Sequence, residues 1–283
     1  MKFPSFSYAK PASLAEVTQI LAEDDSARVI AGGQSLLPLL AFRLAYPSQL
    51  IDLSGVSELE VIRKDVDSLV LGAMVTHVRN LTDPTVAECM PIIPKVVEHV
   101  AHEAVRSRGT VGGSVCHSDA AAEMPALMIA LQARMHIAGQ SGSRVLPAEE
   151  FLLGHYTTAL EPGEILTHIQ IPFTPYLWAF EEIVRRKGDF ALAMAFAGLK
   201  MDQGRCTQAR LVMAALCERP TVCSEAVQFL TGKAIDESVA EEAAGIALQG
   251  LSVRSDIHGS EDLRKHQARA AMKRAILRAS KGE

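Results

Sequence analysis

The sequence predicts an α+β fold made of three consecutive units. Strand, helix and strand patterns alternate over residues 1–55, which indicates a small α/β lobe. Residues 56–175 mix neighbouring strands with helices, and residues 176–283 combine two long strands with helices behind them. The chain has 283 residues, of which 48% are hydrophobic and 22% charged, so it can bury a substantial core without disulfides.

The first unit opens with a short strand at residues 5–9. Ser13 and Glu16 match a capping box, in which the Ser13 hydroxyl caps the first turn of a helix and the Glu16 carboxylate reaches back to the Ser13 amide. That helix is expected to end at about Glu23. A short apolar strand, an apolar helix and a further strand are expected at residues 28–31, 36–44 and 49–53.

The second unit contains both strand and helix patterns. Strands are expected at residues 59–63, 68–71, 134–138, 144–146 and 164–171. Helices are expected at residues 84–90, 92–103 and 120–132. Pro172, Pro175 and the loop between them mark the boundary with the third unit.

The third unit is expected to be a small antiparallel sheet with helices behind it. Its two long strands, at residues 191–201 and 205–217, are joined by Asp202-Gln203-Gly204. Because the glycine can adopt positive φ, this tripeptide predicts a hairpin turn. Helices follow near residues 222–230, 236–249 and 260–281, and Trp178 is interpreted as an anchor of the core.

The charge of the chain argues against a nucleic-acid binder, because the net charge is -5. Basic residues do cluster in the last twenty positions, where they alternate with apolar residues. This pattern favours a solvated helix face over a contact with RNA or a membrane. The clustered residues are Arg264, Lys265, Arg269, Lys273, Arg274, Arg278 and Lys281.

Targeting and metal-binding signals are not found. The N-terminus lacks the apolar segment of a secretory signal, and the apolar stretches at residues 36–40 and 124–131 are too short to span a bilayer. A cytoplasmic protein without membrane insertion is therefore expected. The five cysteines form no C-x-x-C pair and the nine histidines show no metal-binding spacing, so neither an iron–sulfur cluster nor another metal site is expected in this chain.

The chemistry is expected in two glycine-containing loops. The first, Ala31-Gly32-Gly33-Gln34-Ser35, lies where a strand ends and a helix begins. Paired glycines let the backbone approach a ligand closely, and successive amides at the start of a helix form an anion site. The loop matches neither the Rossmann nor the P-loop pattern, and by itself it is more commonly a plain turn.

The second loop, Thr110-Val111-Gly112-Gly113-Ser114, again places two glycines beside small hydroxyl residues. A helix is expected to begin near Ala120, with Asp119 close to its start. Two such loops can hold the two phosphates of one dinucleotide from opposite sides. Neither loop contains lysine or arginine, so backbone amides and Ser/Thr hydroxyls are expected to stabilise the pyrophosphate charge.

These loops and the segments around them closely resemble the FAD-binding medium subunits of the carbon monoxide dehydrogenase and xanthine dehydrogenase family. The similar segments follow one another in order over essentially the whole chain. They are residues 31–38 (AGGQSLLP), 43–45 (RLA), 50–53 (LIDL), 106–114 (RSRGTVGGS), 117–119 (HSD), 164–167 (EILT) and 187–191 (KGDFA).

The resemblance implies a two-lobed FAD-binding fold of the vanillyl-alcohol-oxidase/PCMH type, followed by a C-terminal domain of antiparallel strands and helices. It also implies an FAD-carrying electron-transfer subunit of a heteromeric molybdenum hydroxylase. A large subunit with a molybdopterin-type molybdenum cofactor would hydroxylate the substrate, and a small subunit with two [2Fe-2S] clusters would pass electrons to the FAD and on to a terminal acceptor. The implied assembly is a dimer of heterotrimers.

The resemblance also assigns roles to single residues. Residues 31–35 and 110–114 would bind the FAD pyrophosphate, with Leu36 beside them. Asp119 would bind the ribityl or ribose region, next to His117 and Ser118. The backbone of Leu166 and the side chain of Lys187 would lie near the isoalloxazine edge, where a cation favours the anionic reduced flavin, and Phe190 would contact the ring. No residue of this chain is expected to act as an acid or base on the organic substrate.

Three positions depart from the pattern of the family. Phe190 stands where relatives often have tyrosine, Ala120 where proline is common, and Glu123 where aspartate is common. With Phe190 the contact to the ring survives but a hydroxyl bond is lost, whereas the other two departures affect only the detailed geometry of their loop. Among other residues, His77 is interpreted as a solvated or capping histidine in preference to one close to the cofactor or a redox partner. Cys116 is interpreted as a small packed residue. Arg185 and Arg186 are interpreted as surface residues.

Two alternatives remain open at this point. A stand-alone flavin reductase or oxidase with the same FAD-binding fold would work without partners. An assembly or scaffolding protein would keep the fold but lack the cofactor, although the intact glycines in both loops argue against it. The sequence leaves the substrate of the complex undetermined among N-heteroaromatic compounds, carbon monoxide, aldehydes and acyl thioesters, and it does not identify the terminal acceptor.

Overall fold

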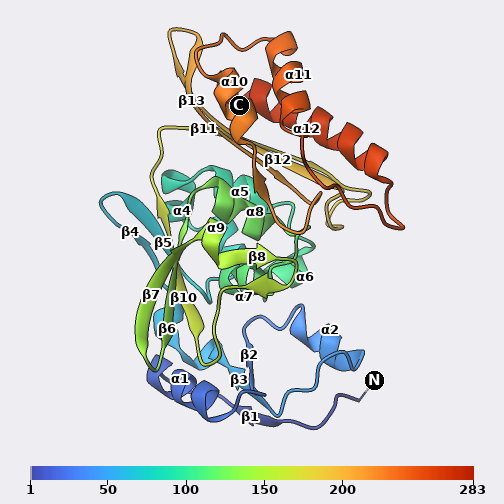
Figure 1. Cartoon of the computed structure of the whole chain (residues 1–283). Coiled ribbons are helices and arrows are strands. Elements are labelled where there is room, and N and C mark those ends of the chain that lie inside the picture. Colours follow the sequence, from blue (N-terminus) through green and yellow to red (C-terminus); the bar gives the residue numbers. More distant parts are fainter. Residues whose placement is uncertain (1) are drawn as a thin grey trace.

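A computed structural model describes residues 2–283 of the chain. Three regions follow one another along the length of the molecule, with the N-terminal lobe at one end and the C-terminal sheet with its helices at the other (Figure 1). Strands and helices are mixed in all three regions, so the predicted α+β class is confirmed.

The N-terminal lobe is built on a three-stranded parallel sheet with the order β1-β3-β2. All of its predicted elements are present, but the helix expected at residues 36–44 ends at Ala41, shortly before Arg43 adopts a φ of 57°. The elements are β1 (Ser7–Ala9), α1 (Leu14–Glu23), β2 (Arg28–Ile30), α2 (Leu36–Ala41), β3 (Gln49–Asp52), and the 3-10 helices η1 (Leu53–Gly55) and η2 (Ser57–Glu60).

The cap of α1 differs in one contact from the prediction. The Ser13 hydroxyl accepts a hydrogen bond from the amide of Glu16 at 3.3 Å, as expected for an N-cap. The carboxylate of Glu16, however, accepts from the amide of Ala12 at 2.9 Å and not from that of Ser13. The capping box therefore closes one residue earlier than the sequence pattern predicts.

The middle region contains a five-stranded antiparallel sheet with the order β4-β5-β10-β6-β7. Its strands are β4 (Ile62–Lys64), β5 (Ser68–Gly72), β6 (Arg134–Gly139), β7 (Gly142–Pro147) and β10 (Ile165–Pro172), with a small pair formed by β8 (Leu152–Gly154) and β9 (Thr157–Thr158). Its helices are α3 (His77–Thr82), α4 (Pro84–Cys89), α5 (Ile92–Val97), α6 (Glu103–Arg106), α7 (Val111–His117), α8 (Glu123–Ala130) and α9 (Ala148–Phe151). The prediction of a strand at residues 59–63 is wrong for its first half, because residues 59 and 60 belong to the 3-10 helix η2.

The helix predicted over residues 92–103 is two separate helices, α5 and α6. Between them, Ala101 adopts a φ of 42°, which a continuous helix does not allow. The guanidinium group of Arg106 donates to the carbonyl oxygens of Val100 and Ala101, at 2.9 Å each. This side chain therefore holds the bend in place, although it comes from a later turn of the chain.

The second glycine segment is also not a loop, because Val111–His117 forms α7. The Thr110 hydroxyl caps this helix by accepting from the amide of Gly113 at 3.0 Å. Ser118 ends it with a φ of 52°, and the next helix begins at Glu123 and not near Ala120. The prediction of a loop was wrong because paired glycines suggest a turn unless tertiary packing favours a helix.

The reason for the glycine at position 112 lies in this packing. A Cβ atom on Gly112 would lie 2.6 Å from both the Cβ atom and the carbonyl oxygen of Ala73. The amide of Gly112 donates to the same carbonyl at 2.9 Å. Helix α7 therefore lies directly against the end of β5, closer than any larger residue would permit.

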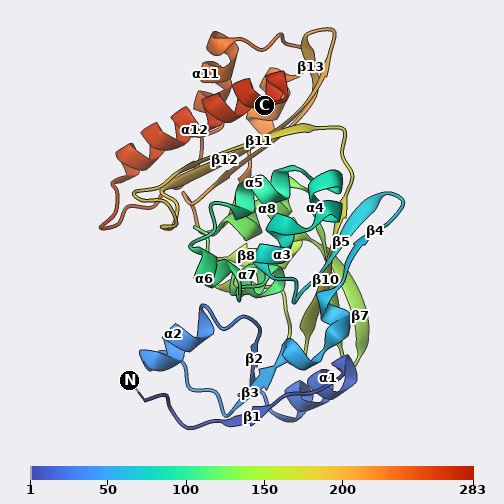
Figure 2. The same ribbon diagram turned by 180° about the vertical axis from the view of Figure 1, so that it is seen from behind.

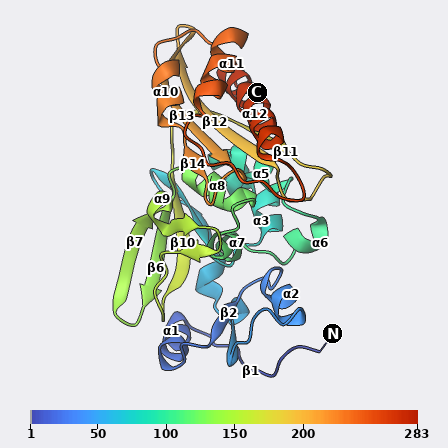
Figure 3. The ribbon, with the colours of Figure 1, turned by 45° about the vertical axis from the view of Figure 1, so that its right-hand side comes forward.

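The C-terminal region is a four-stranded antiparallel sheet with the order β11-β12-β13-β14. Helices α11 and α12 lie on the face that points away from the middle region (Figure 3). The predicted strands and helices are confirmed, whereas β11 and β14 were not predicted. The elements are β11 (Leu177–Ile183), β12 (Ala193–Asp202), β13 (Arg205–Ala214), β14 (Thr221–Val222), α10 (Ser224–Leu230), α11 (Glu237–Ile246) and α12 (Glu261–Lys281).

The hairpin between β12 and β13 has the turn that the sequence predicts. Gln203 and Gly204 both adopt positive φ, at 46° and 77°, which is the geometry of a type I′ turn. The strand expected to continue to residue 217 ends at Ala214, because Ala215 adopts a φ of 64°.

The basic face of α12 is largely paired with glutamates of neighbouring elements. Arg278 bonds Glu181 of β11 at 2.6 Å, and Arg269 bonds Glu241 of α11 at 2.6 Å. The interpretation as a solvated face is wrong for Arg264, which is 1% exposed. Among residues 2–283, no helix is long and apolar enough to cross a membrane.

The core between the middle and C-terminal regions is continuous. Met124 and Leu127 of α8 belong to the same buried cluster as Phe196 of β12 and Val212 of β13. Helices α5 and α8 therefore lie directly under the C-terminal sheet (Figure 2). A separate cluster fills the other face of this sheet, under α10, α11 and α12.

Candidate functional site

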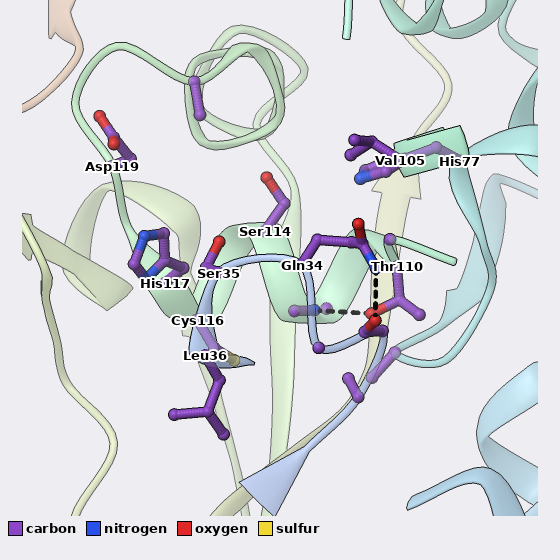
Figure 4. A pocket seen from close by; sticks show the side chains of 18 of the residues that line it. Gln34, Ser35, Leu36, His77, Val105, Thr110, Ser114, Cys116, His117 and Asp119 are labelled. Carbon is purple, nitrogen blue, oxygen red and sulfur yellow. Dashed lines mark hydrogen bonds between the residues drawn. The ribbon is translucent and has the colours of Figure 1, made fainter. Parts of the chain in front are cut away.

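A cavity of about 470 Å³ lies between the N-terminal lobe and the middle region, and the segment between β11 and β12 of the C-terminal sheet also lines it. Its size falls in the range of roughly 300–1,000 Å³ that is typical of small-molecule sites. Residues 31–36 of the first glycine loop, residues of α7, and Leu166 of β10 line it, together with residues 188–190 between β11 and β12. Figure 4 shows the first loop, with Gln34 and Ser35, in front of the helix that carries Ser114 and His117.

The first glycine loop offers unused backbone donors to this cavity. Within residues 2–283, none of the amides from Gly32 to Ser35 donates a hydrogen bond. Gly33 adopts a φ of 73°, which turns the chain between β2 and α2. Consecutive amides without a partner, in a segment that lines a cavity, are suited to an anionic group.

The position of this loop depends on close packing against the middle region. A Cβ atom on Gly32 would lie 2.1 Å from the carbonyl oxygen of Arg108 and 2.8 Å from the Cα atom of Gly109. Only a hydrogen atom fits there. The glycine therefore serves to bring the first loop against the segment that precedes α7, and so joins the two walls of the cavity.

The second glycine segment cannot offer amides in the same way. The amides of Val111, Gly112, Gly113 and Ser114 donate to Val75, Ala73, the Thr110 hydroxyl and the Thr110 carbonyl. The expectation that amides of both segments are free is therefore wrong. Helix α7 instead lines the cavity with two glycines, which have no side chain, and with small polar side chains.

The acidic residues of the cavity differ in their surroundings. Glu123, at the start of α8, is 7% exposed, and its burial raises the pKa of its carboxyl group to about 8, with a smaller contribution from the charge of Glu182. Glu164 is held by Arg144, whose guanidinium nitrogens lie 2.7 and 2.6 Å from its oxygens. This hydrogen bonding lowers the pKa of Glu164. Burial thus favours the protonated form of Glu123, whereas the bonds to Arg144 favour the ionised form of Glu164.

His77 also lines the cavity, and the interpretation as a solvated or capping residue is wrong. It is 3% exposed, and burial lowers its pKa to about 4, assisted by the charge of Arg106. Its Nδ1 atom has no hydrogen-bond partner within residues 2–283. A Cβ atom on Gly109 would lie 2.9 Å from the His77 ring, so the ring packs tightly against that glycine.

A cluster of rings stands beside Asp119. The Tyr156 hydroxyl donates to Asp119 at 3.2 Å, and the Tyr156 ring lies between those of His117 and His155, with centroid distances of 4.7 and 3.7 Å. Tyr156 adopts a φ of 56°, an unusual conformation for a large residue. Its amide donates to Ser118 at 2.8 Å, which helps to hold this geometry.

Most of the predicted site residues are brought together at the cavity. They are Ala31, Gly32, Gly33, Gln34, Ser35, Leu36, Thr110, Gly112, Gly113, Ser114, His117, Asp119, Leu166 and Phe190. Three predicted residues do not line it. Val111 is fully buried, Ser118 is buried with its hydroxyl donating to Gly154, and Lys187 is exposed at the turn before Gly188.

Other lining residues were not identified as site residues from the sequence. Glu123 was noted as a departure from a family pattern, and His77 was interpreted as a solvated or capping residue. The available signal for Glu123 is that it is a single charged residue within a long run of alanines and other apolar residues. Cys116 lines the cavity but is packed as expected, and burial raises the pKa of its thiol to about 12.

Comparisons with known proteins agree with this geometry. Residues 4–174 match the family described as the FAD binding domain in molybdopterin dehydrogenase, and residues 178–279 match the CO dehydrogenase flavoprotein C-terminal domain. Both matches together cover almost the whole chain.

Curated relatives are similar over their full length. The chain is 36% identical over 279 residues to the nicotine 6-hydroxylase medium subunit of Paenarthrobacter nicotinovorans, which covers 99% of each chain. It is 35% identical over 278 residues to the carbon monoxide dehydrogenase medium chain of Afipia carboxidovorans, covering 97% of this chain and 96% of that one.

A solved structure extends the similarity to the fold. A chain of quinoline 2-oxidoreductase from Pseudomonas putida 86 superposes with a TM-score of 0.98 and is 58% identical, covering 100% of this chain and 99% of that one. The protein is an oxidoreductase subunit, and it belongs to the FAD-binding medium subunits of the molybdopterin dehydrogenases, the family of carbon monoxide dehydrogenase and xanthine dehydrogenase.

Proposed function

We propose that this chain holds FAD in the cavity described above and passes electrons from [2Fe-2S] clusters of a partner subunit to a terminal acceptor. The observation that carries this proposal is the set of free amides from Gly32 to Ser35 on the cavity wall. In this arrangement the chain positions the cofactor, adjusts its potential and docks to its partners, while a large subunit with a molybdenum cofactor oxidises the substrate.

The residues present fit a dinucleotide. The amides of the first loop suit a pyrophosphate, and Arg28 is the only lysine or arginine among the lining residues, all of which lie within residues 2–283. Gly113 keeps the opposite wall flat, and a Cβ atom there would lie 2.8 Å from the Thr110 hydroxyl oxygen that caps α7. The Ser114 side chain adds a hydroxyl group to the same wall (Figure 4).

Other parts of the cavity suit the remaining groups of FAD. Both oxygens of Asp119 already accept one hydrogen bond, from the Ala121 amide at 2.9 Å and from Tyr156. Each carboxylate oxygen can accept a second, so Asp119 can still bind a ribityl or ribose hydroxyl. Leu166 is 2% exposed and supplies an apolar wall, and Phe190, which is 65% exposed, stands free to contact a ring at the entrance.

When bound, FAD would accept electrons one at a time from the [2Fe-2S] clusters and pass them singly or in pairs to the terminal acceptor. The chain's own residues would bind its phosphates and exclude water from the apolar wall. Lys187 is exposed and does not line the cavity, so its proposed effect on the reduced flavin would require its side chain to reach over the turn that contains Gly188.

The proposed assembly is a dimer of heterotrimers, each with a large molybdenum subunit, this chain and a small [2Fe-2S] subunit. The substrate class that we propose is N-heteroaromatic compounds. Support comes from the 58% identity to the chain of quinoline 2-oxidoreductase, compared with 34% for a chain of Cu,Mo-CO dehydrogenase. The proposed compartment is the cytoplasm, where the five free cysteines would stay reduced.

Purification of the native complex tests this proposal. We expect the chain to co-purify with two partner subunits and to show flavin absorbance, and we expect the separated chain to oxidise no N-heteroaromatic compound by itself. Full turnover by the separated chain would instead support the stand-alone flavin enzyme. A complex without flavin absorbance would support the scaffolding alternative, which the free amides of the first loop argue against.

A further inference from the structure

The carboxyl group of Asp119 is buried in the cavity wall without a lysine or arginine beside it. Asp119 lines the cavity next to His117, and its side chain is 9% exposed (Figure 4). Within residues 2–283, its nearest basic nitrogen is Nδ1 of His155, which lies 3.9 Å from Oδ1. A buried carboxylate is costly unless hydrogen bonds satisfy it, so neutral donors must hold this one.

The turn between β8 and β9, residues 154–156, is bonded to the backbone just before Asp119. The Ser118 hydroxyl donates to the carbonyl of Gly154 at 2.8 Å. In return, the amide of Tyr156 donates to the carbonyl of Ser118 at 2.8 Å. These two bonds fix the residue that precedes Asp119, which itself adopts a φ of 52°.

A third bond fixes the backbone just after Asp119. The amide of Ala120 donates to Nδ1 of His155 at 3.2 Å. Since Nδ1 accepts this bond, it carries no proton and cannot donate to the carboxylate of Asp119. Residues 154–156 therefore hold both neighbours of Asp119, and we call this segment the clasp.

The side chain of Tyr156 reaches the carboxylate itself. Its hydroxyl donates to Oδ2 of Asp119 at 3.2 Å, while Oδ1 accepts from the amide of Ala121 at 2.9 Å. Partial burial and the charge of Asp119 raise the pKa of the Tyr156 hydroxyl, so it keeps its proton and remains a donor at neutral pH. Tyr156 adopts a φ of 56°, and a large residue keeps such a conformation only where its surroundings impose it.

We propose that the clasp positions Asp119 for its ligand and that the Tyr156 hydroxyl is the group that orients the carboxylate. This inference rests on the proposed function, because the hydroxyl group that Asp119 would bind belongs to the ribityl or ribose part of FAD. Tyr156 acts through Asp119 and needs no contact with the cofactor. Ser118 likewise contributes through its bond to the clasp, and not from the cavity wall.

The advantage of this arrangement is that the carboxylate is oriented before the ligand arrives. Each oxygen of Asp119 accepts one bond from the chain and can accept a second from a hydroxyl group. A side chain that is already fixed loses little conformational freedom when it binds, so more of the interaction contributes to affinity. Loss of the clasp is therefore expected to weaken FAD binding while the rest of the fold stays intact.

The test compares Tyr156→Phe with the same change at an exposed position, Tyr46→Phe. Phenylalanine keeps the ring at position 156 and removes only the donor. Tyr46 is 66% exposed and does not line the cavity. In the flavin-containing complex, FAD released after dilution is followed by its fluorescence. We expect release to be about fivefold faster in Tyr156→Phe and unchanged in Tyr46→Phe, and equal rates in both would overturn the proposal.

A double-mutant cycle shows whether Tyr156 acts through Asp119. We expect Asp119→Ala to speed FAD release at least about tenfold, and we expect Tyr156→Phe to add no further change in that background. Ser118→Ala removes a different bond of the clasp, and its smaller effect, about twofold, should disappear in the same background. If the effects of Asp119→Ala and Tyr156→Phe multiply, Tyr156 acts independently and the proposal is wrong.

Thermal unfolding of the flavin-free complex separates positioning from a general loss of stability. We expect the unfolding midpoint of Tyr156→Phe to equal that of Tyr46→Phe, because the hydroxyl serves the site and not the core. A clearly lower midpoint would assign Tyr156 a purely structural role and overturn the proposal. A native complex without flavin would instead contradict the proposed function itself, so the two failures are distinguishable.

Discussion

Gly32 shows how a single hydrogen atom can decide the shape of a site. The residue has an ordinary place at the end of β2, but its missing side chain lets the first glycine loop touch the carbonyl group of Arg108. The two walls of the cavity meet at this contact. The importance of the residue therefore lies in the distance between two segments and not in the flexibility of the loop.

A Gly32→Ala substitution tests this view. Its Cβ atom would lie 2.1 Å from the Arg108 carbonyl oxygen, so the loop must move away, at a cost of about 1–3 kcal/mol. We expect FAD binding to weaken at least about tenfold, measured as FAD retained after gel filtration of the complex. Gly154→Ala is the matched control, because no atom lies within 4 Å of its added Cβ atom. Equal FAD content in both variants would contradict the prediction.

His77 makes a prediction about pH. Its pKa is about 4 in the folded chain and near 6.5 in the unfolded chain, so the unfolded state binds the proton first as the pH falls. Stability is therefore lost between about pH 6.5 and 4. At pH 5 we expect the chain to lose about 2 kcal/mol more than a His77→Gln variant does, relative to pH 7. Urea unfolding at both values measures this, and equal losses in both proteins would contradict it.

At the scale of elements, α12 is tied to the sheet that it covers by a buried cation. Arg264 binds both oxygens of Asp256, at 2.8 and 2.7 Å, and donates to the carbonyl of Leu192 at 2.9 Å and to that of Ala215 at 3.3 Å. It thus joins the start of the helix to the beginning of β12 and the end of β13. Sequence pattern alone suggested a solvated face, because a buried arginine has the same spacing as an exposed one.

An Arg264→Met substitution is expected to destabilise the chain by about 3 kcal/mol. This is the low end of the range for breaking a buried ion pair, because Asp256 keeps a third of its side chain exposed and can be hydrated. Arg269→Met is the control, since its pair with Glu241 is exposed and contributes less than about 1 kcal/mol. Thermal unfolding of both variants measures the difference, and similar losses would contradict the assigned role.

At the scale of the whole molecule, the boundary near residue 175 divides the sequence but not the core. The family matches end and begin on either side of it, at residues 174 and 178. Yet Phe180, Phe196 and Val212, which follow the boundary, belong to the cluster that buries Met124 and Leu127 of α8. The C-terminal region therefore completes the packing of the region that forms the cavity.

A fragment ending at residue 175 is consequently expected not to fold as an independent unit. Removing the C-terminal sheet would expose the apolar side chains of α5 and α8, and such a surface favours aggregation. We expect the fragment to aggregate or to unfold without a cooperative transition, as seen by light scattering and thermal circular dichroism. A soluble, monomeric fragment with a sharp transition would show that the middle region is self-sufficient.

The sequence by itself determined the order of the elements, the α+β class, the two glycine segments and the family. Such features depend on local torsion preferences and on the periodicity of side chains. Both are set by residues that are close together in the sequence. The hairpin at Gln203 and Gly204 is a clear case, since its turn is set by two residues. The first glycine loop was likewise placed at the end of a strand, where the structure has it.

Only the tertiary structure decided that the second glycine segment is a helix whose amides are already bonded, and that His77 and Arg264 are buried. It also decided that Glu123 is buried at the wall of the cavity. Burial and pairing depend on which distant segments pack together, and a glycine, histidine or arginine has the same local pattern in either environment. The physical reason is that the energies of burial and pairing arise from contacts across the core, between segments that are far apart in the sequence.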